Sequence, residues 1–263
     1  MDGYDKNKSY KLISSIDNLV YGLPKQTETS VRKTIEEVIA LRPDRIAFYS
    51  YAHVPWTSKG QRLFDENDLP SAVEKLQLYV TGKELFAEAG YNDIGMDHFA
   101  LPTDDLYIAL QQGTLHRNFM GYTTQSTKLL LGLGVSSIGD VGTAFAQNNK
   151  TLQEYYETVR AGNLPVTRGF MLNDEDLSFR QYILDLSCKG ETTFDPAHLP
   201  LLREYSFPEL DKLSDDGFLD YDDDGIEVTP LGRHFVRNIC RAFDLHLLRN
   251  ELVATNKMFS KAI

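Results

Sequence analysis

The sequence predicts an α/β protein built from two parts, and three observations support this. The first fifty residues contain a strand-like, a helix-like and a second strand-like stretch in succession. Alternating strand and helix patterns then continue to about residue 165. The remaining residues instead show a helix, a hairpin and a further helix. We therefore predict two domains, residues 1–165 and 166–263.

The first stretch indicates a βαβ unit. Residues 17–21 and 45–51 are apolar or aromatic runs typical of strands, and residues 29–41 carry apolar side chains at helical spacing. Gly22-Leu23-Pro24 ends the first strand, and Arg42-Pro43 ends the helix, because a residue before proline rarely stays helical. At this spacing the two strands are expected to be parallel, with a right-handed crossover.

Cap residues place the next elements. Ser71 is a suitable N-cap for a helix that runs to Ala89, and Gly90 suits its end. A short strand is expected near residues 92–96. Thr103 and Thr151 are expected to begin two further helices, since acidic residues follow each of them.

The C-terminal part has a different pattern. Asn173-Asp174-Glu175-Asp176 begins a helix that carries Leu177, Arg180, Ile183 and Leu184, and a second helix is expected near residues 207–214. An Asp-Gly turn at residues 224–225 lies between two alternating runs, which predicts a hairpin. A helix then begins at Thr229-Pro230, with proline at its first position. This order resembles a winged-helix module.

Composition narrows the classes of function. The chain has 263 residues, and its formal net charge of −11 disfavours nucleic acid as a partner, because such a surface repels phosphate. No apolar run is long enough to span a bilayer, and the N-terminus shows no secretory signal. We therefore expect a cytoplasmic protein with no membrane span.

The cysteine count limits metal chemistry. The two cysteines, Cys188 and Cys240, do not form a disulfide framework and cannot supply the three or four thiolates of an iron–sulfur cluster. The six histidines show no metal-ligand spacing. We predict no metal site in this chain, and we interpret both cysteines as buried thiols on helices.

Candidate binding residues lie in loops that follow the predicted strands, where α/β proteins place their sites. The loop at residues 22–27 offers Lys25, and the loop at residues 52–56 offers His53. Both loops could also be ordinary turns with exposed polar residues. His98, in Gly95–Ala100, is a third candidate, for which a structural role remains the alternative.

Residues 116–125 combine polar, aromatic and glycine residues in one predicted loop. Such a composition favours a segment that closes over a ligand, although a plain connector remains the alternative. The small residues at 133–139 are a weaker signal of a binding loop.

Together, these segments resemble those of the oxygen-independent coproporphyrinogen III oxidases, radical-SAM dehydrogenases of haem (porphyrin) biosynthesis. The resemblance covers residues 17–263, and the matching segments are Val20-Tyr21-Gly22-Leu23-Pro24-Lys25-Gln26-Thr27, Tyr51-Ala52-His53, Gly95-Met96-Asp97-His98-Phe99-Ala100, Leu115-His116-Arg117-Asn118-Phe119, Gly121-Tyr122-Thr123-Thr124-Gln125 and Asn238-Ile239-Cys240. A haem-chaperone paralogue typically has His-Asn-x-x-Tyr-Trp where this chain has residues 116–123, which favours the oxidase branch.

The resemblance implies a fold and a reaction. The fold is the C-terminal part of a radical-SAM (β/α) barrel followed by a helical, winged-helix-like domain. In the family, a [4Fe–4S] cluster and S-adenosyl-L-methionine generate a radical that abstracts hydrogen from two propionate side chains of coproporphyrinogen III. Loss of carbon dioxide then gives the two vinyl groups of protoporphyrinogen IX.

Some family positions carry over by resemblance. Ala52 and Ile138 match positions that contact S-adenosylmethionine, and Asn18 stands where the family has a cofactor-contacting aspartate. Phe119 matches a residue near the active site, and Met120 replaces the glutamine that usually follows it. None of these residues is assigned a catalytic role.

The family's CxxxCxxC cluster motif has no match here, so we expect this chain to be inactive alone. Tetrapyrrole binding without catalysis is one alternative, with Lys25, His53, Arg62 and Arg117 as candidate cations for the propionates. A protein-docking module in residues 165–263 is another, and its triply acidic hairpin tip argues against DNA. A sheet edge at residues 18–21 also predicts self-association.

Overall fold

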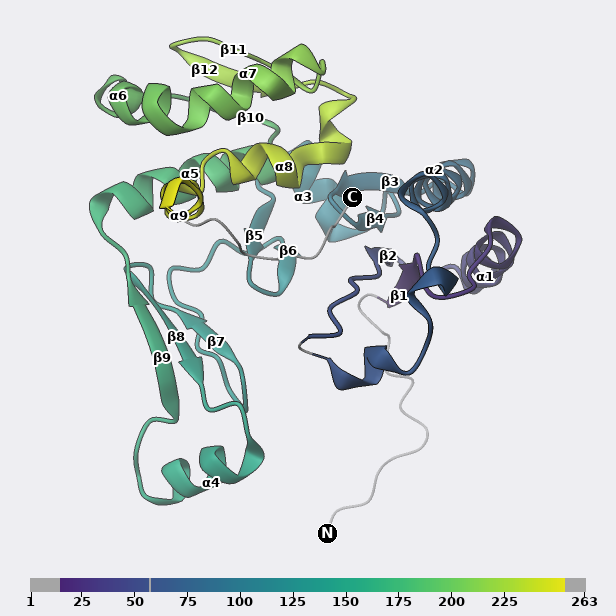
Figure 1. Ribbon diagram of the computed structural model, residues 1–263, viewed down its shortest axis with the longest axis horizontal. Helices are drawn as coiled ribbons and strands as arrows, with labels where there is room; N and C mark the ends of the chain where they lie inside the picture. Colours follow the sequence, from purple (N-terminus) through teal and green to yellow (C-terminus); the bar gives the residue numbers. More distant parts are fainter. Residues whose placement is uncertain (1–14, 57, 254–263) are drawn as a thin grey trace. The chain divides into compact units, whose positions relative to one another are not determined.

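The structure is a computed structural model that describes residues 15–56 and 58–253 (Figure 1). The chain divides into two compact units between Gln111 and Gln112. The domain boundary predicted near residue 165 therefore falls inside the second unit, because the strand that follows it pairs with the strand before it.

The first unit contains a four-stranded sheet with the order β1-β2-β4-β3. Its strands are β1 (Ile16–Tyr21), β2 (Arg45–Ser50), β3 (Asn92–Gly95) and β4 (His98–Ala100). Its helices are α1 (Glu28–Leu41), α2 (Ala72–Glu88) and α3 (Asp105–Gln111), with short 3-10 turns η1 (Lys59–Arg62) and η2 (Glu66–Asp68). Strands β1 and β2 are parallel, which confirms the predicted βαβ unit.

Strand β4 is antiparallel to both of its neighbours, which the sequence did not reveal. Gly95 and Met96 have φ values of 135° and 50°, so the chain reverses between β3 and β4. The short strand predicted near residues 92–96 is present as β3, and β4 follows it directly as a second strand. The reversal depends on a positive φ at Met96, a conformation that a methionine rarely adopts.

Side-chain hydrogen bonds fix most of the predicted helix starts. Thr27 and Ser71 form capping boxes at α1 and α2. For α3, the side chain of Asp104, rather than Thr103, accepts a hydrogen bond from the Leu106 N–H at 2.8 Å. The same carboxylate accepts from Arg45 Nε at 2.7 Å, which ties the start of α3 to β2.

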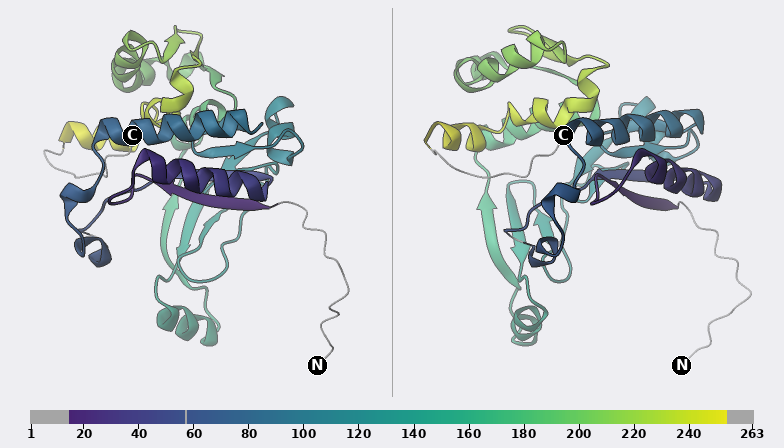
Figure 2. Two further views of the ribbon diagram at one scale, coloured as in Figure 1. Left: turned by 90° about the vertical axis from the view of Figure 1, so that its right-hand side faces the viewer. Right: turned by 45° about the vertical axis from the view of Figure 1, so that its right-hand side comes forward.

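Helices α1 and α2 lie along one face of this sheet (Figure 2). The core between them contains strand residues and helix residues that are at most 9% exposed. Its buried members are Tyr21, Val31, Ile35, Ile46, Phe48, Leu78, Leu85, Phe86, Tyr91, Phe99 and Leu101. Because strand side chains alternate, the residues between these strand positions point to the opposite face.

The second unit begins with a hairpin of β5 (His116–Asn118) and β6 (Gly121–Thr123). The prediction of one loop over residues 116–125 is therefore wrong. Asn118 Oδ1 accepts from the Met120 N–H at 2.8 Å, and Gly121 has a φ of 123°, so a tight turn joins two short paired strands.

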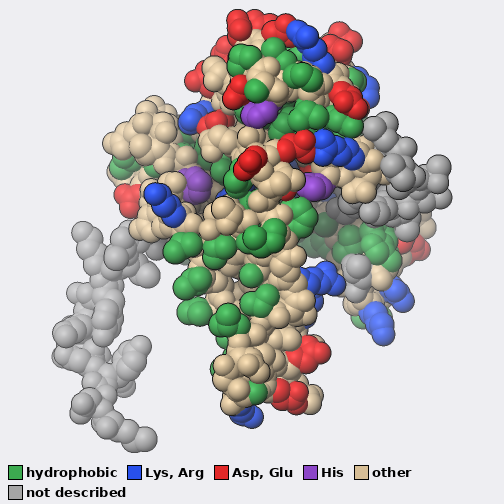
Figure 3. All heavy atoms as spheres, turned by 90° about the vertical axis from the view of Figure 1, so that its left-hand side faces the viewer, with side chains coloured by type: hydrophobic (Ala, Val, Ile, Leu, Met, Phe, Trp, Pro, Cys, Tyr) green, Lys and Arg blue, Asp and Glu red, His purple; other side chains and the backbone are tan. Residues whose placement is uncertain are grey.

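A three-stranded antiparallel sheet follows, formed by β7 (Ile138–Asp140), β8 (Ala144–Asn148) and β9 (Val166–Met171). Helix α4 (Leu152–Arg160) connects β8 to β9, and Thr151 is its N-cap, as predicted. Every residue of β9 is exposed. Figure 3 faces this side of the unit and shows hydrophobic side chains over the sheet.

The rest of the second unit is mainly helical. It contains α5 (Asp174–Cys188), α6 (Leu199–Leu201), α7 (Phe207–Asp215), α8 (Val236–Arg241), α9 (Leu245–Val253) and the short turns η3 (Pro196–His198), η4 (Leu202–Ser206) and η5 (Gly232–Phe235). The predicted hairpin is present as β11 (Leu219–Tyr221) and β12 (Gly225–Val228), and β10 (Glu191–Thr193) adds a third strand. No helix in the described ranges is long and apolar enough to cross a membrane.

Gly82 allows α2 to approach the sheet closely. A Cβ atom at this position would lie 2.4 Å from Cε1 of Phe48, which is 1% exposed. Gly82→Ala is therefore expected to lower the free energy of unfolding by about 1–3 kcal/mol, despite the better helix propensity of alanine. Urea unfolding followed by circular dichroism and by the fluorescence of Trp56, the single tryptophan, measures this change.

Gly60→Ala is the matched control, because no atom lies within 4 Å of the added Cβ. Equal stability of the Gly82→Ala and Gly60→Ala variants would contradict the close approach of α2 to β2.

Candidate functional site

Two of the predicted residues, Asn18 and His98, share the sheet face that α1 and α2 leave uncovered. Asn18 pairs with Ala47 across β1 and β2, and Ala47 pairs with His98 across β2 and β4. Paired positions point to the same side of a sheet, so the two side chains flank Ala47. The His98 ring also lies edge-on to Tyr49, with ring centroids 5.9 Å apart.

The loops after β1 and β2 hold three more predicted residues, each already engaged. Lys25 Nζ lies 3.4 Å from Asp68, on a side chain that is 76% exposed, so this pair adds little stability. His53 Nε2 lies 3.2 Å from Oε1 of Glu66. The Ala52 carbonyl accepts a hydrogen bond from Gln61 Nε2 at 3.1 Å.

Ile138, the remaining predicted cofactor contact, begins β7 in the second unit and is half-buried. Its backbone packs against Gly132, where a Cβ would lie 2.8 Å from the Ile138 carbonyl carbon. Ile138 belongs to the second unit, whereas Asn18 and Ala52 belong to the first.

Arg117 and Phe119 are brought together at a cavity of about 530 Å³ in the second unit. The hairpin β5–β6, the sheet β7–β9 and the helices α5 and α9 all contribute to its wall. Five phenylalanines give the cavity an aromatic lining: Phe119, Phe145, Phe170, Phe179 and Phe243. Polar groups lie among them: Arg117, Asn118, Asp140, Glu175, Asp176, Arg180, Asp244 and His246.

Arg117 is the cavity's uncompensated cation. Its guanidinium lies 5.8 Å from the centroid of the Tyr122 ring. Tyr122 is held in turn by a hydrogen bond from its hydroxyl to the Ser187 carbonyl at 2.8 Å. Among the residues that the structure describes, no carboxylate forms an ion pair with Arg117. A positive charge on an aromatic wall suits an anionic group on an otherwise apolar ligand.

Arg180 is a second arginine of the cavity, and the site prediction missed it. It forms an ion pair with Asp140 and donates a hydrogen bond to the Gly142 carbonyl at 3.4 Å. The available signal was a cation on the apolar face of the helix predicted after residue 173. The partner Asp140, however, lies in a strand far away in the sequence, which no local pattern indicates.

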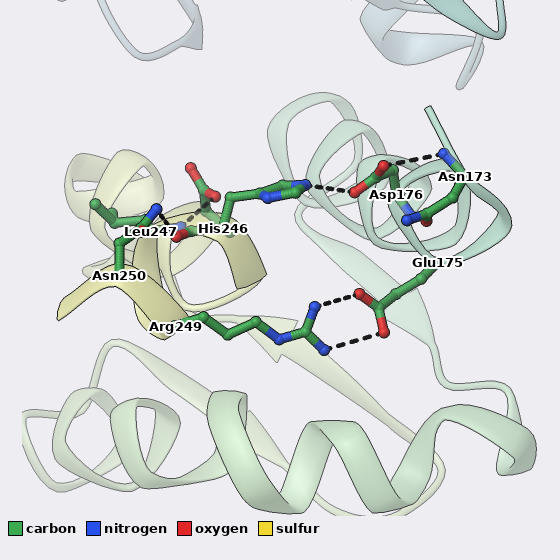
Figure 4. Close-up of polar contacts among 8 residues, drawn as sticks. Asn173, Glu175, Asp176, His246, Leu247, Arg249 and Asn250 are labelled. Carbon is green, nitrogen blue, oxygen red and sulfur yellow. Dashed lines mark hydrogen bonds and ion pairs between the residues drawn. The ribbon is translucent and has the colours of Figure 1, made fainter. Parts of the chain in front are cut away.

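Two ion pairs hold α9 against the start of α5 at the rim of the cavity (Figure 4). His246 Nε2 lies 2.6 Å from Asp176, and Arg249 Nη1 lies 2.6 Å from Glu175. Burial raises the pKa of the Asp176 carboxyl, but hydrogen bonds from the Asn173 N–H and from His246 outweigh it and leave this pKa below its usual range. The rim carboxylates are thus engaged by α9 and by their own helix cap.

The cysteines of this chain do not fit an iron–sulfur cluster. Cys188 and Cys240 are both buried, and burial raises the pKa of the Cys188 thiol to about 11. Burial raises the pKa of the Cys240 thiol too, and its sulfur lies 3.3 Å from the Ser187 hydroxyl oxygen. Cluster ligands are thiolates, so two neutral, buried thiols provide no such site.

A larger hollow of about 640 Å³ lies against the sheet β10–β12–β11. Acidic side chains dominate its lining, and none of the predicted site residues contributes to it. Glu191 and Asp220 are both paired with Glu227 across the strands, so like charges face one another there. We therefore regard the aromatic cavity as the better candidate site.

We compared the chain with known proteins. No family model matches the sequence. The oxygen-independent coproporphyrinogen III oxidase of Pseudomonas aeruginosa is 42% identical over 236 residues, which cover 88% of this chain and 51% of that protein. The Escherichia coli protein of the same name is 40% identical over 252 residues, which cover 94% of this chain and 54% of that protein. This chain thus spans about half the length of both relatives.

A shorter relative of the same name, from Thermostichus vulcanus, is 39% identical over 94% of this chain and 77% of its own length. Among solved structures, a coproporphyrinogen III oxidase from Escherichia coli, described as a radical SAM enzyme, matches with a TM-score of 0.81. That match has 40% identity and covers 89% of this chain and 55% of the other. It confirms the predicted α/β fold, and the chain belongs to the family of oxygen-independent coproporphyrinogen III oxidases.

Proposed function

We propose that this chain forms the C-terminal part of an oxygen-independent coproporphyrinogen III oxidase and binds the tetrapyrrole substrate. The whole enzyme, of which this chain would form one part, would convert coproporphyrinogen III to protoporphyrinogen IX by oxidative decarboxylation. The observation that carries the proposal is the aromatic cavity, because two matched residues, Arg117 and Phe119, line it together.

The cavity's own chemistry suits such a ligand. A tetrapyrrole presents a broad apolar surface with carboxylates at its edge, and aromatic walls bury the first while a cation binds the second. Arg117 would hold a propionate, and the ring of Phe119 would pack against the macrocycle and exclude water. The reaction removes the carboxylate, so Arg117 would bind substrate more tightly than product.

The cofactors would supply the radical chemistry when bound to the whole enzyme. S-Adenosylmethionine is proposed to contact Asn18, Ala52 and Ile138, in keeping with the resemblance. The cluster ligands would come from the part of the longer relatives that this chain does not match, since its own two thiols do not fit. We place the reaction in the cytoplasm, because two free thiols suit a reducing compartment.

Tetrapyrrole binding without catalysis is the second candidate function. The cavity supports it, because aromatic walls and a cation can bind a tetrapyrrole without taking part in its decarboxylation. Of the four cations considered, Lys25 and His53 face carboxylates, and Arg62 donates to the Pro55 carbonyl at 2.6 Å. Arg117 is the one of the four that lines the cavity.

A protein-docking role for residues 165–263 has less support. The hairpin tip carries Asp222, Asp223 and Asp224, and Arg203 Nη2 lies 2.6 Å from Asp223. An acidic tip remains unsuited to phosphate, so we do not extend this role to nucleic acid.

Tetrapyrrole binding is tested by titrating the chain with coproporphyrin III and following its absorbance. Arg117→Ala is expected to weaken binding about tenfold, because a charged hydrogen bond to a propionate is lost. Arg160→Ala is the control, since Arg160 lies on α4 outside the cavity. A parent chain that does not bind, or equal weakening by both substitutions, would contradict the proposal.

Catalysis distinguishes the two candidate functions. The cluster-bearing segment of the Escherichia coli relative, joined in line before residue 17, is expected to restore decarboxylation when reductant and S-adenosylmethionine are added. Anaerobic assay for protoporphyrinogen IX measures this activity. A reconstituted cluster and normal tetrapyrrole binding without any product would favour the purely binding role.

Self-association through β1 is also proposed, because β1 lies at the edge of the sheet. Ile16 and Val20 are 51% and 39% exposed on this strand, and an exposed edge can pair with a second copy. Size-exclusion chromatography with light scattering is expected to show a dimer that Ile16→Lys disrupts. Leu63→Lys is the control at another exposed apolar position, and a parent chain that stays monomeric at high concentration would refute the idea.

A further inference from the structure

Three side chains from different elements form a continuous stack at the cavity. The Arg180 guanidinium lies 5.1 Å from the centroid of the Phe145 ring. Phe145 in turn meets Phe119 edge to face, with centroids 4.9 Å apart and an interplanar angle of 82°. The stack therefore connects α5, through β8, to the turn between β5 and β6.

Arg180 is well suited to anchor this stack. The ion pair with Asp140 and the hydrogen bond to the Gly142 carbonyl hold its guanidinium on two sides. Asp140 Oδ1 also accepts from the Gly142 N–H at 2.8 Å, so one carboxylate organises both the arginine and the turn after β7. A planar guanidinium held in this way presents a fixed face to an aromatic ring.

Phe119, in contrast, has little support of its own. It lies in the two-residue turn of a short hairpin, its side chain is 51% exposed, and its neighbour Met120 is 86% exposed. Among the described residues, Phe145 is the aromatic ring in contact with it. The orientation of Phe119 toward the cavity thus depends on a ring that Arg180 holds in place.

We propose that Arg180 is a positioning residue for Phe119 and acts on it through the ring of Phe145. Arg180 fixes Phe145, and the edge-to-face contact then limits Phe119 to one orientation at the cavity wall. Pre-organised rings bind a flat ligand better, because less conformational entropy is lost on binding. The consequence for tetrapyrrole binding rests on the proposed function, whereas the effect on the Phe119 ring does not.

The alternative is that Arg180 only ties α5 to the β7–β8 turn as a structural ion pair. Both roles predict a less stable protein without Arg180, so stability does not separate them. The orientation of the Phe119 ring does, because an ion pair that merely joins two elements leaves that ring unchanged.

The test uses fluorine NMR of the chain labelled with 4-fluorophenylalanine. The signal that disappears in Phe119→Leu identifies Phe119, and Phe145→Leu shows where this signal moves when its ring partner is lost. Arg180→Gln is expected to move the Phe119 signal toward its position in Phe145→Leu. Arg249→Gln is the matched control, because it removes another ion pair to α5 without touching Phe145, and it is expected to leave the signal in place.

Two further measurements keep the proposal open to refutation. Asp140→Asn, which loosens Arg180 without removing it, is expected to move the Phe119 signal in the same direction if Arg180→Gln does not fold. In coproporphyrin titrations, Arg180→Gln is expected to weaken binding about threefold in the parent and to have no effect in Phe119→Leu.

A Phe119 signal that is unchanged in both Arg180→Gln and Asp140→Asn would overturn the proposal. The proposal would also be overturned if Arg180→Gln weakened coproporphyrin binding equally in the parent chain and in the Phe119→Leu variant. A parent chain that binds no coproporphyrin would defeat the proposed function instead, and the fluorine signal would still decide the role of Arg180.

Discussion

Helix α5 is the element on which the candidate site depends, and the ion pair between Arg180 and Asp140 is its central interaction. The start of α5 holds α9 through Glu175 and Asp176, and its last turn accepts the Tyr122 hydroxyl of the β5–β6 hairpin. One regular helix thus fixes three separate walls of the cavity. Sites built on rigid elements hold their side chains more accurately than sites built on loops alone.

In the first unit, helices α1 and α2 cover one face of the sheet and form the apolar core with it. Gly82 lets α2 approach Phe48, and the alternation of the strands then directs Asn18 and His98 to the other face. Asn18, one of the residues that the resemblance assigns to the cofactor, and the candidate residue His98 therefore lie opposite the apolar core. The apolar core and these two candidate residues thus occupy opposite faces of one sheet.

Local signals in the sequence predicted much of the fold, because their causes are local. The βαβ unit, the caps at Ser71 and Asn173, and the Asp-Gly hairpin all depend on interactions within a few residues. The antiparallel β4 and the β5–β6 hairpin were missed, since short strands carry little periodicity and the reversal at Met96 uses an unusual backbone conformation. Of the predicted site residues, Arg117 and Phe119 are two positions apart in the sequence, and both line the cavity. Arg180 and Asp140, which lie 40 positions apart, could not be paired from a pattern.

The two kinds of chemistry that the family needs are unequally represented in this chain. A binding cavity requires apolar walls and a fixed cation, and the second unit provides both from its own residues. A cluster requires several accessible thiolates, whereas burial keeps the thiols of Cys188 and Cys240 protonated. The described residues thus provide a cavity with apolar walls, whereas the two buried cysteines do not provide cluster ligands. Arg117 and Phe119 both line this cavity, and all of its lining residues belong to the second unit.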